Sequence, residues 1–81
     1  MIVRIVTFAR IRELVGAAAL ERAVEEGTTA GDAFDGLAVE FPSLAGLAQS
    51  TRFVRDGAFV PSSAELRDGD ELGLLPPYGG G

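Results

Sequence analysis

The chain contains neither cysteine nor histidine among its 81 residues. Without cysteine it can form no disulfide, no thiolate nucleophile and no thiolate zinc ligand. Without histidine it lacks the usual general base and the commonest metal ligand. Acidic residues remain, but none stands beside a plausible nucleophile or in a metal-like cluster. We therefore expect no metal site, no bound cofactor and no conventional side-chain catalysis.

Long apolar runs and an excess of positive charge are also missing. No segment approaches the roughly 20 apolar residues of a membrane span, and the first residues lack the apolar core and cleavage site of a secretory signal. The formal net charge is −5, which argues against nucleic acid or an anionic membrane as partner and fits docking onto basic proteins. These features predict a cytoplasmic protein that binds neither nucleic acid nor membrane.

The residues that are present have the composition of one small globular domain. Hydrophobic residues make up 47% of the chain and charged residues 23%, which is typical of a folded protein rather than a disordered one. A chain of this length has room for a single compact core. We predict one domain over residues 1–77 and a flexible tail over residues 78–81.

Strand-forming residues gather in five short segments, separated by tight-turn signals such as Asp56-Gly57 and 68–70. Pro76-Pro77 cannot donate ladder hydrogen bonds and ends the last segment. Residues 9–14 are too few for a full helix, so a single turn is expected there. The predicted strands span residues 2–8, 20–25, 52–55, 58–60 and 71–75.

Period-two alternation assigns the two faces of the first and last strands. Arg4 would not sit in a core, so the residues on either side of it are expected to face inward. The same alternation places Phe8 and Leu75 on the outward face. The core-facing positions are Val3, Ile5, Leu72 and Leu74.

One convincing helix is predicted between the second and third strands, from about Ala30 to Phe41. Thr29 is a good N-cap, and Asp32 three residues later approximates a capping box. Pro42 ends the helix, and a short turn is expected over residues 43–49. The apolar residues recur at helical spacing. They are Ala33, Phe34, Leu37, Ala38 and Phe41.

The element order is strand, strand, helix, strand, strand, strand. Strands at both ends of the chain with one main helix between them predict an α+β domain, a mixed sheet packed on that helix, and the β-grasp fold is the obvious candidate. The first and last strands would then lie side by side and parallel at the centre of the sheet.

Two motifs at opposite ends of the chain resemble one known family. The first is Phe8-Ala9-Arg10-x-Arg12-Glu13-Leu14-Val15-Gly16. The second is Asp68-Gly69-Asp70-Glu71, followed by Leu74-Leu75-Pro76-Pro77-x-x-Gly80-Gly81. Together they resemble the MoaD/ThiS family of ubiquitin-like sulfur carriers, which includes the small subunit of molybdopterin synthase. Arg55 departs from the family pattern, which tends to have a small or apolar residue there.

The resemblance implies a reaction cycle at the carboxyl group of Gly81. An ATP-dependent activating enzyme of the ubiquitin-activating type would adenylate this carboxyl, and sulfur from a persulfide would replace AMP to leave a thiocarboxylate. The tail would then enter the large subunit of molybdopterin synthase, in an expected heterotetramer, and donate sulfur to cyclic pyranopterin monophosphate. ATP would belong to the activating enzyme, and the carrier would supply no catalytic side chain.

The composition of the tail suits this role. Residues 76–81 could reach roughly 20 Å when extended. The prolines stiffen the base of the tail, and the glycines allow passage through a narrow channel. From the resemblance we also expect an exposed docking patch beside the tail. The expected partner-binding residues are Phe8, Phe59, Leu75, Pro76, Pro77, Tyr78, Gly79 and Gly80.

Two alternative functions remain open. The chain could be a sulfur carrier for thiamine-thiazole or cysteine synthesis, or a protein modifier joined through Gly81 to lysines of other proteins. The Phe-Ala-Arg segment and the Leu-Leu-Pro-Pro ending favour the molybdenum pathway, but the sequence does not separate these functions cleanly.

Overall fold

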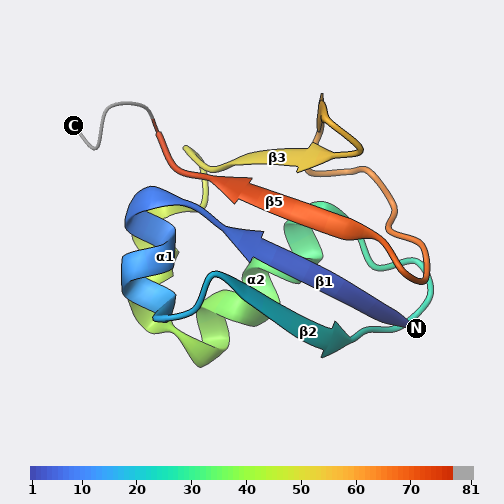
Figure 1. The fold of residues 1–81 in the computed structure, drawn as a ribbon, viewed down its shortest axis with the longest axis horizontal. Helices are drawn as coiled ribbons and strands as arrows, with labels where there is room; N and C mark the ends of the chain where they lie inside the picture. The colour runs from blue at the N-terminus through green and yellow to red at the C-terminus, as the bar shows by residue number, and fades with distance from the viewer. Residues whose placement is uncertain (78–81) are drawn as a thin grey trace.

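The computed structural model describes residues 1–77, so the predicted flexible tail 78–81 lies outside the described residues. A five-stranded sheet packs on helix α2, which crosses behind the strands in Figure 1. The strands are β1 (Ile2–Thr7), β2 (Ala19–Ala23), β3 (Arg52–Arg55), β4 (Ala58–Val60) and β5 (Glu71–Leu75). The helices are α1 (Ala9–Val15), α2 (Ala30–Glu40) and the 3-10 helix η1 (Pro42–Leu47).

The strand order is β2-β1-β5-β3-β4. β1 and β5 pair in parallel, and the other three neighbouring pairs are antiparallel. The first and last strands of the chain therefore lie side by side at the centre of a mixed sheet. This confirms the predicted α+β class and the β-grasp arrangement.

The core lies between α2 and the inner face of the sheet. Phe34 of α2 meets Phe53 of β3 edge to face, with ring centroids 6.3 Å apart. All four residues predicted to face the core are buried. The buried apolar residues of the two central strands are Val3, Ile5, Leu72 and Leu74.

The predicted capping box at the start of α2 is confirmed. The Thr29 hydroxyl accepts a hydrogen bond from the Asp32 amide, and the Asp32 carboxylate accepts one from the Thr29 amide, both at 3.1 Å. The helix ends at Glu40, one residue earlier than predicted. Gly31 within this helix has a role the sequence did not indicate, because a Cβ there would lie 3.2 Å from Ser62.

The prediction of a single turn after the first strand was wrong. Residues Ala9–Val15 form an α-helix that ends at Gly16 in the left-handed region, with the Gly16 amide bonded to the Arg12 carbonyl at 2.7 Å. Ile11 and Val15 are both buried on the side of α1 that faces the core. Packing of these two side chains stabilises a helix that is too short to be stable alone.

Two strand boundaries also differ from the prediction. The first strand ends at Thr7 because Phe8 is the N-cap of α1. The second strand is Ala19–Ala23 rather than residues 20–25, since its extent is set by pairing with residues 2–6 of β1. Both differences arise from contacts with other elements rather than from local sequence preference.

Arg55 occupies the inner face of β3 at the edge of the core, where the related family favours a small or apolar residue. Its guanidinium donates to the Glu65 carbonyl at 2.6 Å and lies 3.5 Å from the Asp70 carboxylate. These two contacts replace water around the charge. The third strand therefore accommodates Arg55 and gains a link to the segment before β5.

Two tight turns position the strands as predicted. Asp56 and Gly57 both have positive φ, 53° and 78°, as a two-residue hairpin of type I′ requires. In the second turn, the Asp70 carboxylate accepts from the Arg67 amide at 2.8 Å, and the Asp68 carboxylate accepts from the Ile2 amide at 2.7 Å. The second turn thus ties the start of β5 to the start of β1.

In the described part of the chain, no helix is long and apolar enough to cross a membrane.

Candidate docking face beside the carboxyl-terminal segment

Strand β5 presents two different faces. Leu72 and Leu74 point inward and are fully buried, so Gly73 and Leu75 point to the opposite, outer face. The register pairs Gly73 with Val6 of β1 on one side and with Val54 of β3 on the other. The outer face of the central strands is therefore apolar from Val6 and Gly73 onward, whereas Arg4 and Glu71 form an ion pair nearer the start of both strands.

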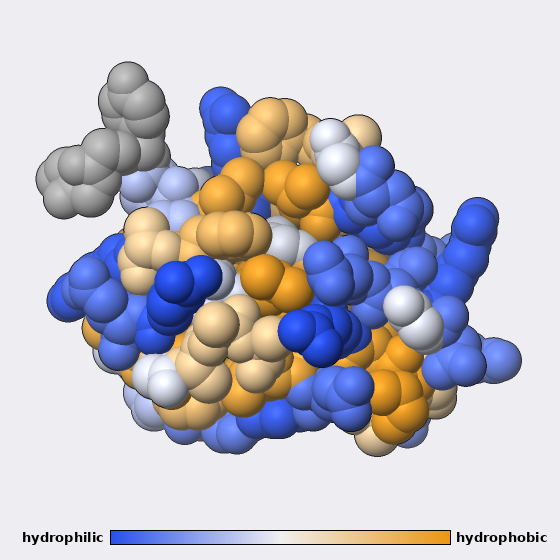
Figure 2. All heavy atoms as spheres, viewed as in Figure 1, coloured by the Kyte–Doolittle hydropathy of each residue, from blue (hydrophilic) through white to orange (hydrophobic). Residues whose placement is uncertain are grey.

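Five side chains form this surface, which we call the outer patch. Figure 2 shows apolar residues gathered across the middle of this face of the molecule, with hydrophilic residues around them. Val54 is directly opposite Phe59 of β4 in the ladder, so the patch continues to the edge of the sheet. The members of the outer patch are Val6, Phe8, Val54, Phe59 and Leu75.

Phe8 lies across Gly73. Its ring carbon Cε2 is 3.3 Å from the position that a Cβ on Gly73 would take, so the glycine provides the space for the ring. Phe8 remains 37% exposed. A hollow of about 240 Å³ lies between Phe8, Val54 and Leu75, and Asp56 and Glu71 also line it.

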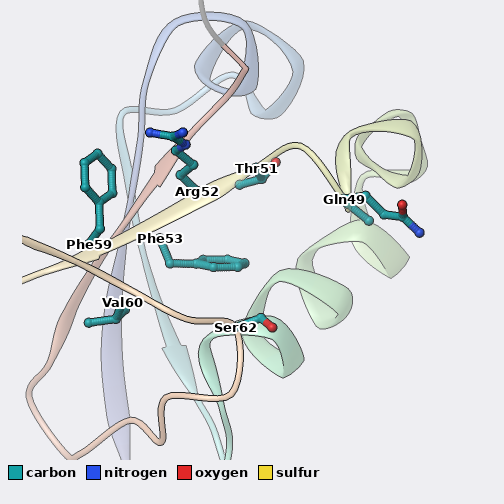
Figure 3. Close-up of a pocket in the computed structure, with 8 residues that line it drawn as sticks. Gln49, Thr51, Arg52, Phe53, Phe59, Val60 and Ser62 are labelled. Carbon is teal, nitrogen blue, oxygen red and sulfur yellow. The ribbon is translucent and has the colours of Figure 1, made fainter.

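Phe59 is the most exposed aromatic residue of the outer patch, with 64% of its surface accessible. It follows the Asp56-Gly57 turn, on the short edge strand β4. The guanidinium carbon of Arg52 lies 5.3 Å from the centre of its ring, within the range of a cation–π contact. Figure 3 shows Arg52 and Phe59 close together, while Phe53 points away toward the helices.

The last described residues leave the sheet next to the outer patch. Leu75 is paired with Arg52 of β3, and it is followed by the half-buried Pro76 and the exposed Pro77. A hollow of about 710 Å³ lies between these prolines and Phe59. The chain that follows Pro77 therefore starts within the same surface region as the exposed aromatic ring.

The structure brings five of the predicted partner-binding residues onto one side of the molecule. The residues placed there are Phe8, Phe59, Leu75, Pro76 and Pro77. Predicted roles for Tyr78, Gly79, Gly80 and Gly81 lie outside the described residues and stay predictions. Among residues 1–77, no three acidic side chains come together in an arrangement that could hold a metal ion.

Besides Val6 of β1, three residues of this region were not singled out from the sequence as partner-binding residues. They are Arg52, Val54 and Gly73, and each belongs to the β3–β5 ladder. Alternation along each strand gives only the relative facing of its own residues. In β3 each face carries an arginine, so which face is outward, and which residues of β3 stand beside β5, depends on pairing between segments that are distant in the sequence.

Comparisons with known proteins agree with the fold of the chain. Residues 5–81 match the ThiS family. The chain is 32% identical over 79 residues to a molybdopterin synthase sulfur carrier subunit of Arabidopsis thaliana, covering 98% of this chain and 82% of that protein. It is 30% identical over 90 residues to small archaeal modifier protein 3 of Haloferax volcanii, covering 91% and 92%. Among solved structures, SAMP1 from Haloferax volcanii superposes with a TM-score of 0.85 at 27% identity over the full length of both chains.

Proposed function

The chain belongs to the ThiS family, as a ubiquitin-like sulfur carrier of the MoaD/ThiS type, and from this premise we propose that it serves molybdopterin synthase. In this proposal the carboxyl group of Gly81 is converted to a thiocarboxylate and donates sulfur to cyclic pyranopterin monophosphate. The outer patch docks onto the large subunit of the synthase. The similarity to a sulfur carrier subunit over 98% of the chain supports this assignment.

One structural observation carries the proposal: β5 leads directly from the outer patch into the segment that follows Pro77. Leu75 belongs to the outer patch, and Pro76 and Pro77 line the adjacent hollow. A partner that covers this face therefore receives the following residues at the same time. Residues 76–81 could extend roughly 20 Å beyond the sheet, which is enough to reach a buried active site.

The proposed chemistry needs activation by another enzyme, because a carboxylate is a poor electrophile at neutral pH. The Gly81 carboxylate would attack the α-phosphate of ATP, forming an acyl adenylate and releasing pyrophosphate. A persulfide would then displace AMP to form an acyl disulfide, and a thiol would cleave this disulfide to leave the thiocarboxylate. Splitting one hard substitution into easier steps is the general logic of covalent activation.

Binding tests with purified partners distinguish the possible pathways. The chain is mixed separately with the large subunit of molybdopterin synthase and with a thiazole synthase, and complex formation is measured by titration calorimetry. We expect a complex with the large subunit and, once the carrier is thiocarboxylated, conversion of cyclic pyranopterin monophosphate to the dithiolene product. Binding to the thiazole synthase alone would assign the carrier to the other pathway.

A second candidate function is protein modification. It is favoured by the 30% identity to a small archaeal modifier protein and by the full-length superposition on SAMP1. In that case the activated carboxyl group of Gly81 would form amide bonds with lysines of target proteins. Incubation with ATP, activating enzyme and cell extract would give a ladder of conjugates that disappears when Gly81 is deleted. A ladder without any sulfur transfer to the pterin precursor would favour this function over the first.

A further inference from the structure

Arg52 is the one charged residue that stands directly beside Phe59 and Leu75 on the outer face. Leu75 is its partner in the β3–β5 ladder, and its guanidinium carbon lies 5.3 Å from the centre of the Phe59 ring. Arg52 and Phe59 are both exposed. Figure 3 shows the guanidinium of Arg52 next to the Phe59 ring rather than folded into the core. Any protein that covers Phe59 must therefore also cover this positive charge.

The charge of Arg52 is not balanced within the described part of the chain. Four other arginines form ion pairs with carboxylates, but between residues 1 and 77 no carboxylate lies within 4.0 Å of the Arg52 guanidinium. Arg12 and Arg67 share this property, but Arg12 belongs to α1, where its Nε donates to the Thr7 carbonyl at 3.4 Å, and Arg67 lies before β5 at the opposite end of the sheet. The ion pairs are Arg4–Glu71, Arg10–Glu13, Arg22–Glu40 and Arg55–Asp70.

The surroundings of Arg52 are more positive than the rest of the molecule. Helix α1 follows β1, which runs parallel to β5, so α1 lies at the end of the sheet where β5 ends (Figure 1). Among residues 1–77, this end carries Arg10, Arg12 and Arg52 against the single acidic residue Glu13, although the chain as a whole has a net charge of −5. A partner with negative charge around its docking site would be attracted to this end and repelled by the rest of the surface.

Docking would remove water from the Arg52 guanidinium. A charged group that loses water without gaining hydrogen bonds opposes binding, so the partner must supply acceptors. The planar guanidinium of Arg52 can donate two parallel N–H hydrogen bonds to the two oxygens of one carboxylate. The face of the guanidinium can stay on the Phe59 ring at the same time, since stacking and in-plane hydrogen bonds use different parts of the group.

We propose that Arg52 is a specificity-determining residue that binds a carboxylate of the partner protein, next to an apolar pocket that takes the Phe59 ring. The occupant of this surface is the protein that also receives the segment after Pro77, so the inference rests on the proposed function. Arginine and aromatic residues are enriched among the residues that dominate binding energy in protein interfaces. In this arrangement Phe59 contributes buried apolar area, and Arg52 selects partners that carry an acidic side chain at the matching position.

Binding of the carrier in its carboxylate form to the purified large subunit tests the inference without any sulfur chemistry. Arg52→Gln is expected to weaken binding by about 10- to 100-fold, the range typical of a central charged contact. Arg52→Glu should weaken it further, and Arg52→Lys should lie between wild type and Arg52→Gln because the charge remains but the pair of parallel N–H donors is lost. Arg67→Gln, which removes an exposed arginine at the far end of the sheet, is the matched control and should bind like wild type.

Salt dependence and charge reversal identify the partner group. The affinity of wild type should fall more steeply with sodium chloride concentration than that of Arg52→Gln, because one charged contact is missing in the variant. Acidic residues near the tail-accepting cleft of the large subunit are then changed to lysine one at a time. One of these changes is expected to weaken binding of wild type and restore binding of Arg52→Glu.

The alternative role for Arg52 is to shield Phe59 from water in the free protein. If Arg52→Gln and Arg52→Glu bind like wild type while Phe59→Ala does not, Arg52 is only such a shield and the inference is overturned. Equal urea unfolding midpoints for all variants show that the binding effects are not due to unfolding. Absence of binding by wild type itself would instead overturn the proposed function, and with it the partner assumed here.

Discussion

The two faces of β5 differ in what their side chains contact, although the residues alternate along one short strand. Leu72 and Leu74 are fully buried in the core, while Gly73 and Leu75 face outward and contribute to a surface that α2 does not cover. Residues on the inner face stabilise the domain. On the outer face, Glu71 is charged, but Gly73 and Leu75 are apolar at positions that the core does not use, which is typical of an interaction surface.

Among the variants that test the difference between the two faces, Leu74→Ala is expected to have the largest effect, a loss of stability. It removes a fully buried side chain and leaves a cavity, so the free energy of unfolding should fall by about 2–5 kcal/mol, a large part of the stability of a small domain. Urea denaturation measures this loss, and Leu75→Ala on the outer face is the matched control. Equal destabilisation by the two variants would mean that Leu75 belongs to the core and that the faces have been assigned wrongly.

Phe59→Ala is expected to have a smaller effect, and on binding rather than on stability. The ring is 64% exposed, so its loss should leave the free energy of unfolding nearly unchanged. Binding to the large subunit should weaken by about 1–3 kcal/mol, as for a central apolar anchor. Titration calorimetry and urea denaturation of the same preparation separate the two quantities. Normal binding together with easier unfolding would remove Phe59 from the docking surface.

Thr29→Ala should have the smallest effect on stability. Thr29 caps α2, the helix that covers the inner face of the sheet. The variant loses the hydroxyl that accepts from the Asp32 amide at 3.1 Å, which should lower the free energy of unfolding by about 1 kcal/mol. Since the capping box lies at α2, away from the outer patch, affinity for the large subunit should not change. A parallel loss of affinity would show that docking depends on stability in general rather than on the outer patch.

Local sequence pattern predicted most of the fold. The capping box of α2, the turn at Asp56-Gly57 and the facing of the central strands depend on neighbouring residues only, and all are present. Helix α1 was missed because its stability comes from burying Ile11 and Val15 rather than from its length. The space required at Gly31 was missed for a similar reason, since the nearby Ser62 is distant in the sequence.

The candidate site was predicted in part. Alternation placed Phe8 and Leu75 outward, and the family resemblance added Phe59. The β3–β4 hairpin has its register fixed by a two-residue turn, but β3 and β5 are joined through a long connection that fixes no register. Only the structure could therefore show that Arg52 lies beside Leu75 and that Gly73 lies beside Phe8.

The central claim is that the carboxyl group of Gly81 is the working group of the protein. Intact-mass measurement after incubation with ATP, activating enzyme and a sulfur donor tests it directly, using the full chain, a variant lacking Gly81 and a variant extended by one residue. Either change moves the carboxyl group by about 3.5 Å, and errors of about 1 Å in the position of reacting atoms can cost roughly a hundredfold in rate. The account predicts that only the full chain gains the mass of an oxygen-to-sulfur exchange and donates sulfur. Charging and sulfur donation by the shortened or extended chain at the rate of the full chain would contradict it.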